Sequence, residues 1–383
     1  MSPTILKAGA LAIALAASSC AHADIKYRVS AIADSADISW NRINNNGLIA
    51  GQFNYARAIL VQNGQMTQPI DYISTIDALN DHGNYGGTYN IDLMNSSSTG
   101  YFAQGGQYTS IPSYATTWRS DYGGVSAINN NNQVVGTVAG RQVRFDAEHP
   151  YYAPRAYLWE NGQMRSLGNL GIDETEAYDI NRYGVVVGRA AVGDMKNAAF
   201  LYARNGMQSL ASYLPTGISS SATGINDAGQ ILGQLYSSGD EHAFLIANGE
   251  TFLFDIDGFR NTKAVGINNA GQFILNGNNG WSGKAAAYVR LNGELFDLNQ
   301  ITGLDSGWSI RESYDINDKG QILVQACTAS FDCRSMLLDP LSAPVLLPGI
   351  PPAVPEPATC GMLLAGLGIA CMLARRQRHA SQI

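Results

Sequence analysis

The amino-acid sequence predicts an all-β protein: a seven-bladed β-propeller of four-stranded antiparallel sheets, closed by its N-terminal strand and followed by a single C-terminal transmembrane helix. Three observations predict the propeller. They are seven copies of one turn, five Asn-Gly pairs at one place in the repeat, and a strand at the start of the chain that belongs to no complete repeat unit. Of the 383 residues, 41 are glycine and only 14% are charged. Short apolar runs separated by polar turn residues are typical of proteins built from many short strands.

The repeated turn reads as an aliphatic residue, Asn, two variable residues and Gly, and its clearest copy is ATGINDAGQILG at residues 222–233. Gly is replaced by Asn132 in the third copy. Asn is the residue besides Gly that best tolerates φ > 0, so this exception also fits a tight turn with a left-handed residue. We expect the turn Asn side chain to bond to nearby backbone. The seven turn asparagines are Asn44, Asn80, Asn129, Asn181, Asn226, Asn268 and Asn317.

Each repeat unit predicts four strands, clearest in the fifth unit as SATGIN, QILGQLY, EHAFLIA and TFLFDI. Asn-Gly, the pair that best marks a type I′ hairpin, separates the third strand from the fourth. Successive turn asparagines lie between 36 positions (Asn44 to Asn80) and 52 positions (Asn129 to Asn181) apart, which suits a four-stranded blade. Such sheets must stack to bury both faces, and stacking around an axis closes a ring. The Asn-Gly pairs begin at Asn63, Asn161, Asn205, Asn248 and Asn292.

The first strand precedes the first repeat unit, and the last repeat unit lacks a fourth strand. IKYRVSAI, residues 25–32, alternates apolar and polar positions and precedes the first turn. The last unit supplies SYDIN, QILVQAC and RSMLLDPL, and then enters a Pro-rich segment without a fourth strand. We therefore expect residues 25–32 to pair with residues 335–341, which would leave no unpaired gap between the first and last blades.

A second signature lies in the third strand of each unit. His242-Ala243-Phe244-Leu245 is matched at residues 155–158, 198–201 and 286–289, with Ile59, Phe102 and Met336 at the degenerate positions of units one, two and seven. In unit two, either GYFAQGG or YATTWRSDYG could be the third strand. Together with the turn, this pattern resembles the HAF repeat of exported bacterial proteins over nearly all of residues 24–340. The resemblance implies a propeller-like fold and no established activity.

Both ends of the chain are predicted to lie outside the propeller, which we place at residues 24–342. Residues 1–23 fit a signal peptide, with Lys7, an apolar run and Ala21-His22-Ala23 before the cleavage point. A lipoprotein leader ending at Cys20 is the alternative. Residues 343–353 form a Pro-rich linker.

The C-terminal segment, residues 354–379, predicts a membrane anchor. Val354, Pro355, Glu356 and Pro357 precede the apolar residues 358–374, and Arg375, Arg376 and Arg378 follow them. This order resembles the PEP-CTERM sorting signal. The resemblance implies Sec export, transient anchoring in the inner membrane, cleavage by an exosortase as partner, and release to the cell surface or an exopolysaccharide matrix. A permanent single-span anchor is the alternative.

The composition of the central region bears on its partners and on its cysteines. The net charge is −7 and no basic stripe occurs in the central region, which argues against a nucleic-acid partner. Cys327 and Cys333 are the only cysteines of the exported domain, and they form either a disulfide or two free thiols. DINDKG, residues 315–320, could suggest a calcium loop, but Asx-turn chemistry explains the same residues. We predict no cofactor and no metal site.

Candidate binding residues lie in two lengthened loops. Unit three inserts residues 139–154, and unit two is lengthened between Tyr89 and Ser113. Equivalent loops of neighbouring blades emerge on one propeller face, where insertions commonly build a binding surface. Aromatic rings beside hydrogen-bonding groups suit a polysaccharide, although the tyrosines could instead cover their own strands. The candidate residues are Tyr101, Tyr108, Arg141, Arg144, His149, Tyr151 and Tyr152.

These observations predict an exported, non-enzymatic propeller that acts as a binding or scaffolding protein of the cell envelope or exopolysaccharide matrix. The alternative is a glycan-active hydrolase or lyase with its site on the inserted loops, where Asp146 and Glu148 are the acids of unit three. A structural spacer without a ligand is the third interpretation.

Overall fold

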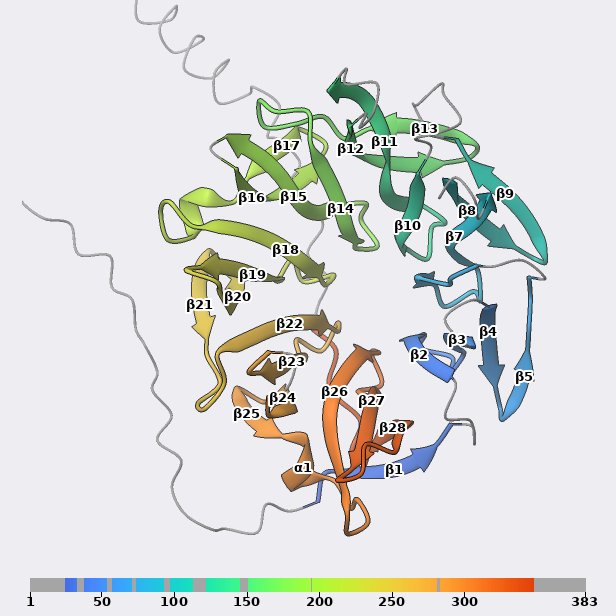
Figure 1. Ribbon diagram of the computed structural model, residues 1–383, viewed down its shortest axis with the longest axis vertical. Coiled ribbons are helices and arrows are strands. Elements are labelled where there is room, and N and C mark those ends of the chain that lie inside the picture. The colour runs from blue at the N-terminus through green and yellow to red at the C-terminus, as the bar shows by residue number, and fades with distance from the viewer. Residues whose placement is uncertain are drawn as a thin grey trace, which may run out of the picture. The chain divides into compact units, whose positions relative to one another are not determined.

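The computed structural model shows seven four-stranded antiparallel sheets arranged around a central axis (Figure 1). This arrangement confirms the predicted seven-bladed β-propeller. The two end segments, with the predicted signal peptide and transmembrane helix, lie outside the described residues. Those residues are 25–32, 38–53, 57–70, 74–92, 97–112, 122–144, 151–193, 195–280 and 283–347.

The first four blades follow one another along the chain, each running from its innermost to its outermost strand. Blade 1 holds β2 (Ile38–Ile43), β3 (Ile49–Phe53), β4 (Arg57–Gln62) and β5 (Gln65–Thr67). Blade 2 holds β6 (Ala78–Leu79), β7 (Tyr85–Asp92), β8 (Ser97–Gln104) and β9 (Gln107–Ile111). Blade 3 holds β10 (Gly123–Ile128), β11 (Val134–Arg144), β12 (Tyr151–Glu160) and β13 (Gln163–Ser166). Blade 4 holds β14 (Thr175–Ile180), β15 (Val186–Gly193), β16 (Lys196–Ala203) and β17 (Gly206–Ser209).

Blades 5 and 6 repeat the plan, and blade 7 combines both ends of the domain. Blade 5 holds β18 (Ser219–Ile225), β19 (Ile231–Ser237), β20 (Asp240–Ala247) and β21 (Glu250–Phe254). Blade 6 holds β22 (Asn261–Ile267), β23 (Phe273–Asn278), β24 (Ala285–Leu291) and β25 (Glu294–Asp297). Blade 7 holds β26 (Trp308–Ile316), β27 (Ile322–Thr328), β28 (Cys333–Pro340) and β1 (Tyr27–Ala31). The assignment of GYFAQGG to β8 settles the third strand of unit two.

The predicted closure of the ring is confirmed by the pairing of β1 with β28. The register runs from Tyr27 opposite Pro340 to Ala31 opposite Met336. The Ser30 hydroxyl also donates to the Asp339 carboxylate at 2.8 Å. In Figure 1 the blue first strand lies beside the red last strands, so one sheet holds both ends of the propeller.

The repeated turns have the predicted conformation. Asn132 has φ of 60°, and the turn glycines of the other six copies have φ between 72° and 77°. In the fifth turn the Gly229 N–H donates to the Asn226 carbonyl at 3.0 Å, and the Gln230 N–H donates to Asn226 Oδ1 at the same distance. The turn Asn therefore holds its own backbone in the way that the sequence predicts.

Four of the five predicted Asn-Gly hairpins have φ > 0 at both residues, as type I′ turns require. The hairpin at Asn205 differs, because Gly206 alone has positive φ and already belongs to β17. Ala203 pairs with Gly206 there, so Arg204 and Asn205 form the two-residue loop. The type I′ prediction is thus wrong at this one position, where the turn is displaced by one residue.

The blade cores depend on a contact between the second and third strands. Gly233 on β19 lies opposite Phe244 on β20, and the aromatic ring takes the space that a side chain at residue 233 would need. Gly188 lies opposite Phe200, and Gly136 lies opposite Tyr157, in the same way. All three aromatic residues are fully buried. The aromatic position of the third strand therefore packs the sheet.

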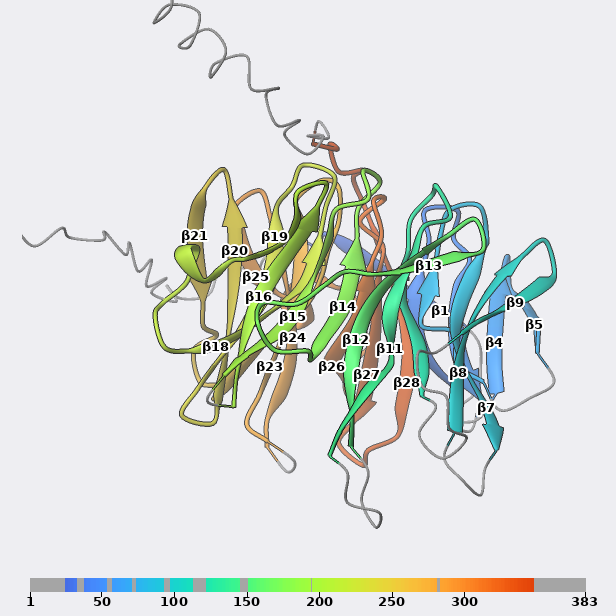
Figure 2. The same cartoon turned by 90° about the horizontal axis from the view of Figure 1, so that it is seen from above.

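The strand order fixes two faces of the ring. First-to-second strand turns and third-to-fourth strand hairpins emerge on one face, which we call the asparagine-turn face. Second-to-third strand loops, including the β11–β12 connection, emerge on the opposite face, which we call the inserted face (Figure 2). The described helices are η1 (Ala211–Tyr213) and α1 (Leu298–Ile301), and neither has the length or apolar character needed to cross a membrane.

Candidate functional site

A polar channel runs along the propeller axis. Its cavity measures about 290 Å³ and is lined by the innermost strands and turns of all seven blades. Three charged side chains, Arg42, Asp179 and Asp315, lie inside it, each two positions before a turn Asn. A charged group at this position occurs in three of the seven units, so the repeat pattern alone did not mark these residues.

The seven turn asparagines form a closed ring around this channel. Each side-chain Nδ2 donates to the backbone carbonyl of the turn Asn in the next blade, at 2.9 to 3.3 Å. The seventh bond runs from Asn317 back to Asn44 and completes the circle. All seven asparagines are buried, with relative exposures of 3% to 5%. The sequence predicted the bonds inside each turn but not this inter-blade ring.

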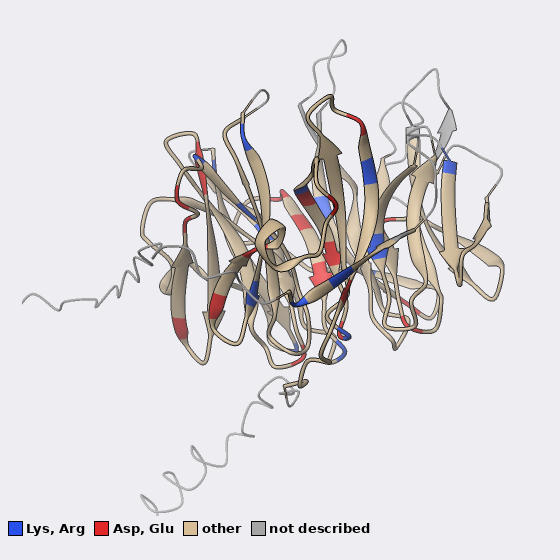
Figure 3. Ribbon diagram, turned by 90° about the horizontal axis from the view of Figure 1, so that it is seen from below, with Lys and Arg blue, Asp and Glu red and all other residues tan. Residues whose placement is uncertain are grey.

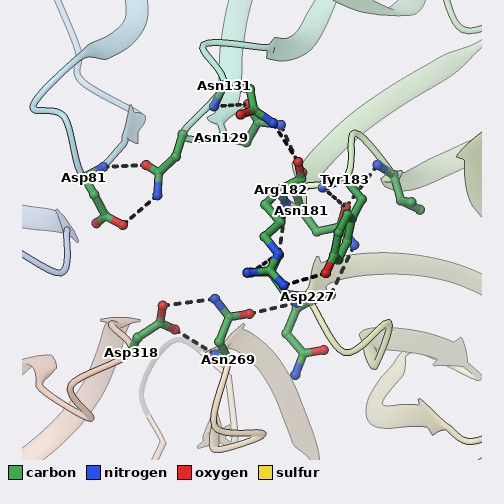
Figure 4. Close-up of polar contacts among 12 residues, drawn as sticks. Asp81, Asn129, Asn131, Asn181, Arg182, Tyr183, Asp227, Asn269 and Asp318 are labelled. Carbon is green, nitrogen blue, oxygen red and sulfur yellow. Dashed lines mark hydrogen bonds and ion pairs between the residues drawn. The ribbon is translucent and has the colours of Figure 1, made fainter. Parts of the chain in front are cut away.

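The residues directly after these asparagines form a second layer at the mouth of the channel. At six of the seven blade junctions, a backbone N–H donates to the side-chain oxygen of the equivalent residue in the next blade, as with Asp227 to Asn269 at 2.8 Å. Arg182 interrupts the pattern because a guanidinium has no acceptor. Asn131 instead donates to the Arg182 carbonyl at 2.8 Å (Figure 4).

Asp179 and Asp315 join blades through their carboxylates. Asp179 accepts the N–H of Ile180 and, across the blade junction, the N–H of Ile225, both at 2.8 Å. Asp315 accepts from Ile316 and, across the closing junction, from Ile43, both at 2.9 Å. Each aspartate therefore serves a backbone donor at the inner edge of the next blade.

Burial in the channel changes the titration of both carboxyls. It raises the pKa of Asp179 to about 6, against the lowering effects of its two backbone hydrogen bonds and of Arg42. Burial also raises the pKa of Asp315, against the lowering effect of Arg42 first and then of its backbone bonds. The channel thus holds two carboxyls that resist ionisation and one cation that favours it.

The calcium interpretation of residues 315–320 has no support from these contacts. The Asp315 oxygens face backbone N–H groups, and Asp318 accepts from Asn45 and Asn269. Within the ranges that the structure describes, no group of three or more His, Cys, Asp or Glu side chains could hold a metal ion.

The predicted binding residues fall into two groups. In blade 2, Tyr101 is 1% exposed and its hydroxyl donates a hydrogen bond to the Thr75 carbonyl, so this side chain belongs to the buried core of the blade. Tyr108 is 47% exposed, and its ring packs at 6.3 Å from Tyr85. This blade therefore supports the interpretation that its tyrosines cover their own strands.

The second group follows the extended β11–β12 pair of blade 3. Gln142 lies opposite Tyr152, and Arg144 lies opposite Tyr151, near the end of the ladder. Arg141 belongs to the same strand, whereas His149 lies outside the described residues. The pairing brings two tyrosines and two arginines to one strand pair on the inserted face.

The structure also shows the positions of the predicted cysteine pair and of His242. The structure contains a disulfide between Cys327 and Cys333, which are directly paired across β27 and β28. His242 Nδ1 lies 2.6 Å from the Asp255 carboxylate at the surface. Figure 3 shows the positions of both Lys and Arg and of Asp and Glu scattered over the described blades.

Comparison with known proteins assigns the C-terminal segment first. Residues 353–378 match the PEP-CTERM protein-sorting motif, which contains Val354, Pro355, Glu356, Pro357, Arg375 and Arg376. This motif implies export, a membrane-anchored intermediate and processing by an exosortase. The chain is therefore a β-propeller that carries a PEP-CTERM sorting signal. No curated protein sequence matches the chain significantly.

Two solved structures with TM-scores of 0.52 support the fold alone. The β-propeller domain of the Trilobed protease from Pyrococcus furiosus matches with a TM-score of 0.52 and 9% identity, over 84% of this chain and 98% of that one. A puromycin-hydrolyzing peptidase of Mycobacterium tuberculosis also has a TM-score of 0.52 and 9% identity, over 85% of this chain and 57% of that one. The acylaminoacyl peptidase of Pyrococcus horikoshii, at 14% identity and a TM-score of 0.47, is matched over 76% of this chain and 50% of its own length. The Pyrococcus furiosus propeller is described as having an open velcro topology, whereas β1 and β28 pair here.

Proposed function

We propose that this protein is an exported, non-enzymatic β-propeller that acts as a binding or scaffolding protein of the cell envelope or exopolysaccharide matrix. The observation that carries the proposal is the sorting motif at residues 353–378 behind a closed propeller. Residues 1–23 act as the signal peptide, and the apolar residues 358–374 act as the transient membrane anchor before release. The seven units are HAF-type repeats in this proposal, because their third-strand aromatic residues occupy equivalent core positions in blades 3, 4 and 5.

The ligand in this proposal is an extracellular polysaccharide bound on the inserted face of blade 3. β11 and β12 have 11 and 10 residues, longer than the 5 to 8 residues of the second and third strands in the other blades. The register places Arg144 opposite Tyr151 at the far end of this pair. Aromatic rings with neighbouring hydrogen-bond donors suit the apolar face and hydroxyl edge of a sugar.

Replacement of both tyrosines tests the polysaccharide site. Tyr151→Ala combined with Tyr152→Ala should reduce retention on purified matrix polysaccharide by at least tenfold. Tyr213→Ala is the control, because Tyr213 is 46% exposed and lies in η1, between blades 4 and 5. Undiminished binding by the double variant would reject this surface. Release of sugar fragments by the wild-type protein would instead favour the hydrolase or lyase interpretation.

A further inference from the structure

The segment after β28 does not leave the propeller directly. The Leu341 N–H donates to the Lys26 carbonyl at 2.9 Å, beside the closing strand. Six residues later, the Leu347 N–H donates at 2.7 Å to the carbonyl of Asn269 in the turn of blade 6. We call residues 341–347 the strap, because it crosses from blade 7 to blade 6 on the asparagine-turn face.

Two turn glycines lie next to the strap. A Cβ atom on Gly271 would lie 2.9 Å from Leu347 Cδ1, and a Cβ atom on Gly320 would lie 3.5 Å from Pro344 Cδ. The turn glycines of blades 1 and 5, Gly47 and Gly229, would have nothing within 4 Å. The strap therefore packs against the turns of blades 6 and 7 in particular.

The strap also covers the mouth of the channel. Leu346 and Leu347 line a cavity of about 400 Å³ together with residues of the second layer. Leu346 is 54% exposed and Leu347 is 36% exposed, whereas Val345 is 86% exposed and takes no part in the cavity lining. The other lining residues are Asn130, Asn131, Arg182, Tyr183, Asp227, Asn269 and Asp318.

We propose that the mouth of the channel is a docking surface for an extended apolar segment, and that the protein's own strap occupies it through Leu346 and Leu347. The segment reads Pro344-Val-Leu-Leu-Pro348, and proline at both ends restricts the unbound chain to extended conformations. Docking therefore fixes few additional backbone torsions, so its cost in conformational entropy is small. A small cost allows even a short peptide contact to form.

Docking also sets the length of free chain before the sorting motif, a consequence that rests on the exosortase processing in the proposed function. With the strap bound, five residues of the sequence, 348–352, separate the Leu347 contact from the motif at residue 353. With the strap released, the free chain begins at residue 342. At roughly 3.5 Å per residue, these five or eleven residues span at most about 18 or 39 Å. The strap thus restricts how far the cleavage region can move from the propeller, and its release should speed processing.

Hydrogen exchange on the full chain in detergent micelles tests the docking. The amide of Leu347 should exchange at least tenfold more slowly than in an unstructured peptide of residues 341–347. Gly271→Ala should reduce this protection, because the added Cβ atom would lie 2.9 Å from both Leu347 Cδ1 and Gln230 Oε1, so the leucine side chain must shift. Gly229→Ala is its matched control, since both glycines have similar φ, 72° and 74°, but residue 229 does not touch the strap.

A second pair of variants leaves the turns unchanged. Leu346→Asp combined with Leu347→Asp should also release the strap, whereas Val345→Asp should not. Equal exchange in these two proteins, or unprotected Leu347 in the wild type, would overturn the docking surface.

Processing in exosortase-containing cells tests the restriction of the free chain. Strap-releasing variants should be processed at least threefold faster than Gly229→Ala and Val345→Asp. Equal rates would reject the restriction. If the wild type and every variant remained unprocessed, the sorting assignment itself would fail, while the exchange result would still decide the docking.

Discussion

At the residue scale, the turn asparagines combine two sets of bonds in one small side chain. Oδ1 of Asn226 fixes its own turn, and Nδ2 reaches the carbonyl of Asn268 in the next blade at 3.1 Å. The first set follows from local sequence, since Asn-x-x-Gly is a turn pattern. The second set joins residues 36 to 52 positions apart at six junctions and 273 positions apart at the closing junction, and no local pattern specifies that contact.

Replacement of one ring asparagine separates these roles. Asn226→Ala should lower the free energy of unfolding by about 3 kcal/mol, because it removes several buried hydrogen bonds and leaves the Asn268 carbonyl without this donor. Asn248→Ala, in an exposed hairpin, should cost about 1 kcal/mol or less. Urea unfolding would measure both values, and similar costs would show that the ring adds nothing to an ordinary turn.

Asp179 gives the protein a specific pH dependence. Its pKa rises from 3.8 in the unfolded chain to about 6 in the fold, so the folded state holds the proton more tightly. Its contribution to stability is therefore present below pH 4 and is lost as the pH rises to about 6.

The Asp179→Asn variant should not show this loss of stability as the pH rises. Between pH 4 and pH 7 its stability should improve relative to wild type by roughly 2 to 3 kcal/mol, the equivalent of about two pKa units. Thermal melts at matched ionic strength would measure the difference. Stability curves that run parallel over this range would contradict the raised pKa.

At the element scale, β1 is the strand on which the closed ring depends. It pairs with β28 over five residues, and its neighbours Lys26 and Leu341 add one further backbone bond between the two chain ends. The side chain of Tyr27 is 1% exposed and belongs to the hydrophobic cluster shared by blades 6 and 7. Loss of this strand would therefore expose both a sheet edge and part of a core.

A proline in β1 tests this dependence. Val29→Pro should lower the melting temperature by about 10 °C or more, because proline cannot adopt the paired strand conformation without losing its N–H and straining its neighbours. Ile25→Pro, at a 56% exposed residue before the strand, is the control. Identical melting of the two variants would mean that closure contributes little to stability.

The elements were largely predictable because each unit repeats the same local chemistry. The turn and hairpin residues located the strands, and the surplus of residues 25–32 indicated where the ring closes. The channel charges were not predictable in this way, since Arg42, Asp179 and Asp315 occupy a position that is Ala or Gly in the other four units. The displaced turn at Asn205 was missed because the same dipeptide fits two registers of a hairpin.

At the scale of the whole molecule, the fold and the sorting motif belong to different parts of the sequence. The motif covers residues 353–378, and the strap makes the last propeller contact among the described residues. Its function was recognisable from sequence because sorting requires a short linear order of residue types. A binding site depends instead on loops brought together by the ring, so the polysaccharide surface remained a hypothesis.

Removal of the sorting signal tests the fate of the whole protein. A chain ending at Ala353 should be exported but never pass through a membrane-bound intermediate, whereas the full chain should accumulate in the inner membrane of cells without exosortase. Cell fractionation would show both distributions. Inner-membrane retention of the full chain even in exosortase-containing cells would support the permanent anchor instead.

The closing strand also imposes an order of events during export. β1 is the first strand of the described propeller, yet Ser30 binds Asp339, which is 309 residues further on. If the N-terminus crosses the membrane first, β1 must wait unpaired on the far side until almost the entire chain has followed. The propeller ring can therefore close only after its last blade has been translocated. By that time the apolar C-terminal segment is the next part of the chain to reach the bilayer.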